Sequence, residues 1–168
     1  MSIRAALAIA AVTGMAFMGT AASAREVVPF EGRVSPGTIV IKTAERRLYY
    51  VRGDGTALRY RVAVGKPGKQ WFGEAQIDGK YVQPAWSPPA EVKRDNPRLP
   101  DVVPGGAPNN PMGARALTLN LDEYAIHGTN RPSSIGTYAS YGCIRMLNQD
   151  IVDLYEQVNV GTRVVVVP

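Results

Sequence analysis

The sequence predicts a mainly β domain, built as a sandwich or a partly closed barrel, with one clear helix near its C-terminal end. Three observations support this class: short β-branched runs, turn residues between them, and a single stretch with helical spacing of apolar residues. The 17 glycines and 13 prolines of this 168-residue chain fall largely between the runs and separate them. No internal repeat and no heptad pattern is present.

The clearest strand covers residues 58–64, where Leu, Tyr and Val alternate with Arg and Ala. A period of two is typical of a half-buried strand. Gly53-Asp54-Gly55 precedes it and predicts a hairpin turn, because glycine tolerates positive φ. The last strand is rich in valine and too apolar for an exposed edge. Further strands are expected at 38–42, 48–51, 73–78, 81–83, 116–119, 124–127 and 162–167.

The expected helix begins near Asn148, which can cap it, and Asp150 suits its first turn. Gly161 ends the region. Its apolar stripe consists of Ile151, Val152, Leu154, Tyr155 and Val158.

Residues 84–111 differ from the rest, because eight prolines and the pair Gly105-Gly106 exclude regular sheet there. A short helix can form at 90–94. Long ordered loops in compact domains are often functional, so we interpret this segment as a Pro-rich lid or wall over a cleft.

Residues 1–24 have the features of a secretory signal peptide. Arg4 precedes an apolar run that is short for a membrane span, and Ala22-Ser23-Ala24 matches a signal-peptidase site. We expect cleavage after Ala24, an exported protein with no membrane span, an N-terminal segment at 25–37 and one catalytic-type domain at 38–168. An uncleaved anchor helix is the alternative.

The charge is mildly basic. Removing Arg4 from the 19 basic residues leaves 18 against 14 acidic ones, so the net charge falls from +5 to +4. A mild excess fits an anionic polymer such as a bacterial wall, or serves solubility alone. No aromatic-basic motif predicts nucleic acid as a partner.

Cys143 and His127 are the only cysteine and the only histidine, and both adjoin glycine. One of each falls short of a metal site or an internal disulfide, so no metal or cofactor is expected. Each can be structural, Cys143 as a small hydrophobe and His127 at a strand end. Alternatively, the loop between them brings the imidazole to the thiol, which needs a base at neutral pH. Gly142 permits a sharp turn that aims backbone N–H groups at an oxyanion.

The stretches His127-Gly128-Thr129-Asn130-Arg131-Pro132 and Ser140-Tyr141-Gly142-Cys143-Ile144-Arg145-Met146 resemble the active-site signature of the L,D-transpeptidase catalytic domain. The similarity extends from about Thr38 to Val167. It implies a β-sandwich-like enzyme that acts on peptidoglycan in the periplasm or cell wall of a bacterium.

The resemblance implies that Cys143 attacks the amide before the terminal D-alanine of a tetrapeptide stem and forms a thioester. A second stem then resolves it as a 3→3 cross-link, or a wall-attached protein serves as acceptor. His127 would be general base and then acid, with the backbone amides of Gly142 and Cys143 as the oxyanion hole.

Tyr141 stands where many family members carry histidine, and a phenol cannot be a base at neutral pH. Arg145 either clamps a stem carboxylate or forms a structural ion pair. Asn130 either orients His127 or stabilises the loop, and Trp86 either lines the groove or anchors its own loop.

Two further functions stay open. Water as acceptor would make the protein an L,D-carboxypeptidase or another amide hydrolase of wall peptides. A non-catalytic wall-binding or regulatory domain could retain the same fold.

Overall fold

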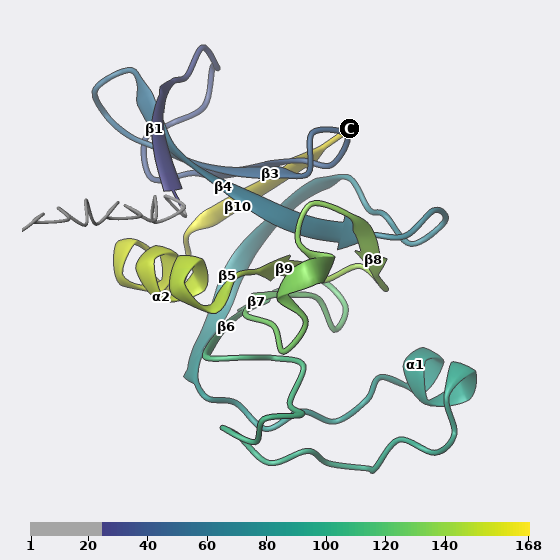
Figure 1. Ribbon diagram of the computed structural model, residues 1–168. Helices are drawn as coiled ribbons and strands as arrows, with labels where there is room; N and C mark the ends of the chain where they lie inside the picture. Colours follow the sequence, from purple (N-terminus) through teal and green to yellow (C-terminus); the bar gives the residue numbers. More distant parts are fainter. Residues whose placement is uncertain (1–24) are drawn as a thin grey trace, which may run out of the picture.

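The computed structural model describes residues 25–168, which form a closed barrel of eight strands (Figure 1). The expectation of a mainly β fold is confirmed, and pairing of β4 with β9 closes the barrel. The expected signal peptide lies outside the described residues. Within the described part, no helix is long and apolar enough to cross a membrane. The barrel order is β4(Thr56–Gly65), β3(Arg47–Val51), β2(Ile39–Lys42), β10(Arg163–Val167), β5(Gly73–Val82), β6(Arg115–Leu119), β7(Ala125–His127) and β9(Ile144–Met146).

The C-terminal strand β10 lies inside the sheet, as its valine content predicts. It pairs in parallel with β2 and antiparallel with β5. The turn at Gly53-Asp54-Gly55 also forms as expected: Gly55 has φ +76°, and the Asp54 carboxylate accepts a hydrogen bond from the Thr56 amide at 3.1 Å. Inward-facing side chains of the strands, among them Ile39, Leu48, Tyr60 and Ile126, fill one continuous core.

The prediction of two separate short strands at 73–78 and 81–83 is wrong. One ten-residue strand, β5, spans the region, with an irregularity in its pairing to β6 between Ile77 and Gly79. A Cβ at Gly79 would lie 2.7 Å from the Thr118 hydroxyl oxygen, so glycine allows close approach at the bulge. The glycine that reads as a break in the sequence therefore keeps the strand continuous.

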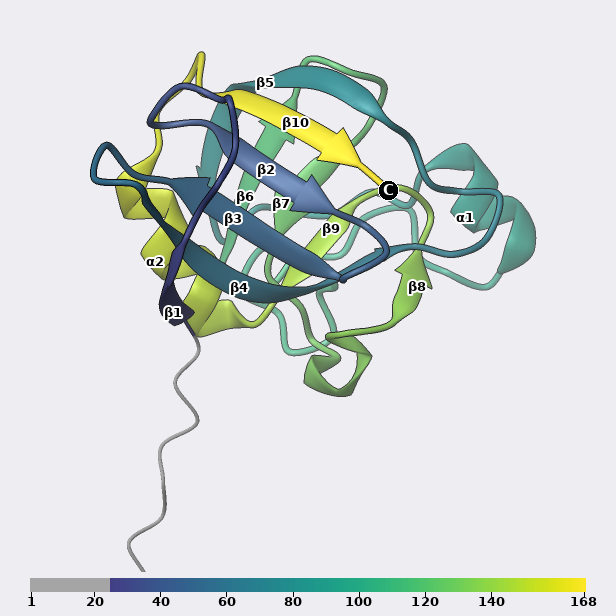
Figure 2. The same cartoon turned by 90° about the horizontal axis from the view of Figure 1, so that it is seen from above.

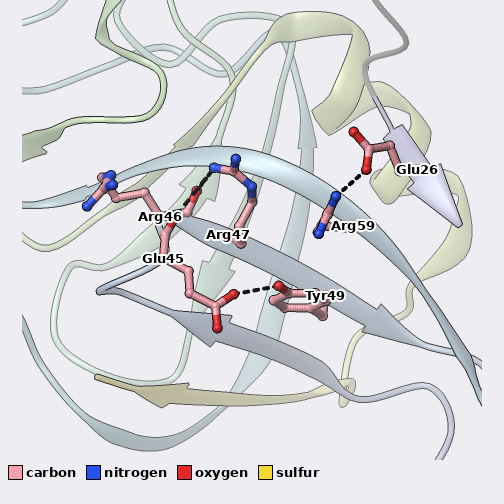
Figure 3. A network of polar contacts seen from close by, with 6 residues as sticks. All are labelled: Glu26, Glu45, Arg46, Arg47, Tyr49 and Arg59. Carbon is pink, nitrogen blue, oxygen red and sulfur yellow. Dashed lines mark hydrogen bonds and ion pairs between the residues drawn. The ribbon is translucent and has the colours of Figure 1, made fainter. Parts of the chain in front are cut away.

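The N-terminal strand β1(Arg25–Pro29) pairs antiparallel with the first half of β4 and covers an outer face of the barrel. There a second small apolar cluster forms around Val40, Tyr49 and Val51. Polar links hold this face together, with Arg59 of β4 donating to Glu26 of β1 and the Tyr49 hydroxyl to Glu45 (Figure 3).

The expected helix is α2(Asn148–Gln157), and it packs against β6 and β7 (Figures 1 and 2). The prediction that Asn148 caps it is wrong, because Leu147 occupies the N-cap and no side chain caps the helix. Asp150 does lie in the first turn, but it is buried, and neither carboxylate oxygen has a hydrogen-bond partner within residues 25–168.

The Pro-rich segment forms a long excursion between β5 and β6, with α1(Ala90–Asp95) at its far end (Figure 1). Its base is ordered: Trp86 and Val103 form an antiparallel bridge, and the Asn110 amide donates to the carbonyls of Pro84 and Pro104, both at 2.9 Å. The remaining elements are η1(Pro132–Ser134) and β8(Tyr138–Ser140), and β8 pairs in parallel with the end of β4.

Candidate active site

His127 ends β7, and Cys143 directly precedes β9, the parallel neighbour of β7. His127 is aligned with Arg145 of β9, and Cys143 comes two residues before Arg145. Ile126 and Ile144 belong to the core inside the barrel, so alternation turns His127, Arg145 and Cys143 to its outer side. Within residues 25–168 the two side chains form no hydrogen bond with each other: His127 contacts the Gly128 carbonyl and Cys143 the Glu123 carbonyl.

The His127 imidazole is almost fully buried, with 4% of its surface exposed. Burial, followed by the positive charge of Arg145, lowers the pKa of His127 to about 4, so the ring is neutral at neutral pH. Nδ1 lies 2.7 Å from the Gly128 carbonyl oxygen. A carbonyl can only accept, so Nδ1 carries the proton in this contact.

The segment before β6 covers His127. Backbone hydrogen bonds with Pro111 and Met112 raise the pKa of the His127 ring. A Cβ at Gly113 would lie only 2.5 Å from the Thr129 nitrogen, so this segment packs closely against the residues that follow His127. Asn148 fixes this contact. Its Oδ1 accepts hydrogen bonds from the amides of Ala114 at 3.0 Å and Thr129 at 3.1 Å, and its Nδ2 donates to the Thr129 carbonyl. The residue predicted to cap α2 therefore ties together the two loops that enclose the histidine.

The Cys143 thiol sits beside the turn that leads into β7. Its sulfur lies 3.9 Å from the Glu123 carbonyl oxygen. Burial raises the pKa of the Cys143 thiol above its ordinary value, and the backbone N–H of Ala125 and the charge of Arg145 act in the opposite direction. The resting pair therefore consists of a neutral thiol and a neutral imidazole.

The turn that presents Cys143 is built from Ser140 and Gly142. Ser140 Oγ donates to the Cys143 carbonyl at 2.5 Å and accepts from the Gly142 amide at 3.2 Å. Gly142 has φ +130°, and a Cβ there would lie 2.2 Å from the Tyr124 ring. Trp71 stacks on Tyr124 at 5.5 Å and donates from Nε1 to the Gly142 carbonyl at 3.1 Å.

Trp71 and Tyr124 are site residues that the sequence reasoning missed. Neither stands in the segment of the active-site signature, and each comes from a different loop. The one sign of them in the sequence is Gly142, because a glycine directly before a candidate nucleophile leaves space that another side chain can occupy.

Arg145 is half-buried beside both candidate catalytic residues. Within the described chain its guanidinium makes no hydrogen bond and no ion pair, and burial, with a further contribution from the charge of Arg131, lowers the pKa of Arg145 below its ordinary value. The alternative of a structural ion pair for Arg145 therefore has no carboxylate to support it among residues 25–168.

The other predicted site residues make their contacts with residues outside the pair. Asn130 is exposed, and its amide donates to the Asn109 carbonyl at 2.9 Å, which links two loops. Trp86 anchors the base of the Pro-rich segment through its bridge to Val103. The Tyr141 hydroxyl donates to Asp95 of α1 at 2.5 Å.

Residues 25–168 contain no group of three His, Cys, Asp or Glu side chains placed to hold a metal ion. The site is a thiol, an imidazole and a guanidinium on one outer face of the barrel. Such a set can carry out acyl transfer through a cysteine nucleophile.

Comparison with solved structures places the fold among L,D-transpeptidases. A mutant of the Enterococcus faecium L,D-transpeptidase aligns with a TM-score of 0.64 at 16% identity, over 80% of this chain and 50% of that one. A Brucella melitensis protein described as a probable carnitine operon oxidoreductase is 45% identical, with a TM-score of 0.56, over 85% of this chain and 92% of its own.

Residues 36–166 match the sequence model of the L,D-transpeptidase catalytic domain, YkuD. The chain belongs to the L,D-transpeptidase catalytic domain family. It is 43% identical to the probable L,D-transpeptidase YbiS of Escherichia coli over 135 residues, which are 75% of this chain and 43% of that protein. The E. coli probable L,D-transpeptidase ErfK/SrfK is 38% identical over 77% of this chain and 43% of its own length. The chain thus spans less than half the length of these curated relatives.

Proposed function

We propose that the protein is a peptidoglycan L,D-transpeptidase that forms 3→3 cross-links, or wall attachments, through a thioester on Cys143. The observation that carries this proposal is the alignment of His127 on β7 with Arg145 on β9, two residues after Cys143, within a chain of this family. Its donor is the tetrapeptide stem, and its place of action is the periplasm or wall of a bacterium, reached through the signal peptide expected at 1–24.

In the first step the Cys143 sulfur attacks the carbonyl carbon of the amide before the terminal D-alanine. His127 Nε2 takes the thiol proton as the S–C bond forms, because neither group is charged at rest. The C–N bond then breaks, and His127 returns the proton to the leaving amine of D-alanine. In the second step the side-chain amine of another stem attacks the thioester, and His127 accepts its proton and protonates the departing sulfur.

The oxyanion of each tetrahedral intermediate lies beside the turn 140–143. The Cys143 N–H is one donor to it. The Gly142 N–H is the second, and to act it exchanges its hydrogen bond with Ser140 Oγ for one with the oxyanion. The Trp71–Tyr124 stack keeps this turn in one conformation, so that the donors need little reorganisation during the reaction.

Arg145 is the candidate clamp for a carboxylate of the donor stem. A half-buried guanidinium without an acidic partner gains most from a carboxylate, which it can bind through two parallel hydrogen bonds. A bound carboxylate would also offset the charge that lowers the pKa of His127, and so make the imidazole a stronger base once the donor is bound. In this proposal Asn130 and Trp86 hold their own loops in place, through Asn109 and Val103 respectively.

Incubation with tetrapeptide muropeptides tests the proposal. Cross-linked dimers with loss of D-alanine support transpeptidation, and both products should disappear in Cys143→Ala. Free tripeptide without dimers would instead show an L,D-carboxypeptidase. Absence of turnover together with undiminished muropeptide binding by Cys143→Ala would show a non-catalytic wall-binding domain.

A further inference from the structure

Helix α1 is held to the barrel by polar contacts. None of its residues is buried, so no apolar face of this six-residue helix fixes its position. Both views place α1 on the same side of the barrel as β8, the strand that leads into Tyr141 (Figures 1 and 2). The contacts that α1 makes with the turn after β4 and with Tyr141 therefore determine where it lies.

Two acidic residues of α1 face two lysines of that turn. Glu91 and Asp95 are four residues apart and thus share one face of the helix. Lys69 forms an ion pair with Glu91, and Lys66 lies 3.7 Å from the Asp95 carboxylate. The turn that carries both lysines is tight, because a Cβ at Gly65 would lie 2.2 Å from the Lys69 carbonyl oxygen.

Tyr141 lies at the centre of this arrangement. Its hydroxyl donates to Asp95 at 2.5 Å, and the Lys66 ammonium sits 3.6 Å from the centre of its ring. The hydrogen bond from Tyr141 is the largest influence on the Asp95 carboxyl, and it lowers the pKa. Burial raises the pKa, the charge of Lys66 lowers it, and the net result is a pKa of Asp95 below its usual range. One phenol thus bridges a lysine of the barrel and a carboxylate of the Pro-rich segment.

The contact is placed to affect the active site at two points. Tyr141 directly precedes Gly142 and Cys143, so a displacement of the Tyr141 ring changes the position of the turn that presents the thiol. The same Pro-rich segment ends at Pro111 and Met112, which cover His127. Tyr141 and the Pro-rich segment thus link α1 along the chain to both candidate catalytic residues.

We propose that Tyr141 is a positioning residue, which with Lys66 and Asp95 latches α1 against the loop that carries Cys143. A histidine side chain is shorter than tyrosine and cannot place a donor where the Tyr141 hydroxyl lies. The acceptor of that hydroxyl is Asp95, which belongs to α1 of this chain. The consequence for turnover rests on the proposed function, whereas the latch itself does not.

The test combines amide hydrogen exchange of α1 with donor kinetics in Tyr141→Phe and Asp95→Ala. Tyr138→Phe is the matched control, because the Tyr138 hydroxyl bonds to Arg46 at 2.9 Å and not to α1. In Tyr141→Phe and Asp95→Ala, exchange in residues 90–96 should accelerate on the order of tenfold, as expected for loss of one hydrogen bond to a charged group at an exposed site. The double variant should exchange no faster than Asp95→Ala alone, since Asp95→Ala already removes the hydrogen bond from Tyr141 together with the contact with Lys66.

In the kinetic arm, KM for the tetrapeptide donor should rise on the order of tenfold in Tyr141→Phe while kcat stays within about twofold. Unchanged exchange in α1 would overturn the latch. So would a fall in kcat with constant KM and unchanged exchange, which would place Tyr141 in the chemistry. If the wild-type protein turns over no muropeptide but α1 exchange responds as expected, the latch stands and the proposed function fails.

Discussion

Replacing Asp150 by Asn should stabilise the protein, and increasingly so as the pH rises. Asp150 is 1% exposed, and its carboxylate has no hydrogen-bond partner in the described chain. Burial, followed by the charge of Asp153, raises the pKa of Asp150 from 3.8 to about 7. Between these two values the folded state binds a proton that the unfolded state has released, so stability falls as pH rises through this window.

The magnitude follows from the two pKa values. Each pKa unit corresponds to about 1.4 kcal/mol, so the contribution of Asp150 to the free energy of unfolding falls by about 3 kcal/mol between pH 5 and pH 8. The asparagine side chain of the variant cannot ionise, so the variant loses nothing at this position. His127 titrates in the same range with the opposite sign, because its pKa is lowered, but it is present in both proteins and cancels in their difference.

The assay is urea denaturation at pH 5, 6, 7 and 8, followed by tryptophan fluorescence. The free energy of unfolding of Asp150→Asn minus that of the wild type should grow by about 3 kcal/mol across this series. Asp101→Asn is the control, since the Asp101 side chain is 94% exposed, and its difference should stay constant. A constant difference for Asp150→Asn as well would show that this carboxylate is solvated or paired in the folded protein, and would refute the reasoning.

Three other predictions concern the turn and the loops of the site. Gly142→Ala should lower the free energy of unfolding by about 3 kcal/mol in urea denaturation, because it adds a Cβ at φ +130° against Tyr124. The control is Gly68→Ala, at φ +78° in open space, which should lower it by about 1 kcal/mol. Equal losses in the two variants would contradict a steric clash between the new Cβ and Tyr124. Asn148→Ala should lower the free energy of unfolding by about 2 kcal/mol in the same assay, because three hydrogen bonds are lost. Asn148→Asp keeps the acceptor oxygen and should lower it by less. A loss below about 0.5 kcal/mol in Asn148→Ala would argue against a stabilising link between the two loops. Arg145→Ala should raise the donor KM on the order of a hundredfold as measured with muropeptides, and an unchanged KM would remove Arg145 from donor binding.

The sequence predicted the strands well where local pattern decides the structure. The period of two in 58–64 and the valine run of β10 each correspond to a strand, and the expected alternation of burial holds from Leu58 to Val62 but not at Ala63, which is fully buried. The break expected in β5 did not occur, because tertiary pairing with β6 accommodates Gly79 as a bulge. Local propensity at a glycine cannot show whether a partner strand absorbs the irregularity.

Side chains that act over long sequence separations were beyond local reasoning. Asn148 has the residue type and position of a helix cap, yet its hydrogen bonds go to residues 34 and 19 positions earlier in the chain. Trp71 and Tyr124 meet at Gly142 only because the closed barrel brings three loops together. The candidate pair, by contrast, could be found because His127 and Cys143 are unique in the chain and stand in one contiguous signature.

The most direct test of the central claim is the pH dependence of acylation of Cys143 by a carbapenem, followed by intact mass. We expect one adduct on Cys143, formed at a rate that is constant from pH 7 to about 5 and falls by half near pH 4, where His127 becomes protonated. His127→Asn should form the adduct far more slowly at every pH. A rate that does not depend on His127, or a protein that stays unmodified under prolonged exposure, would contradict it.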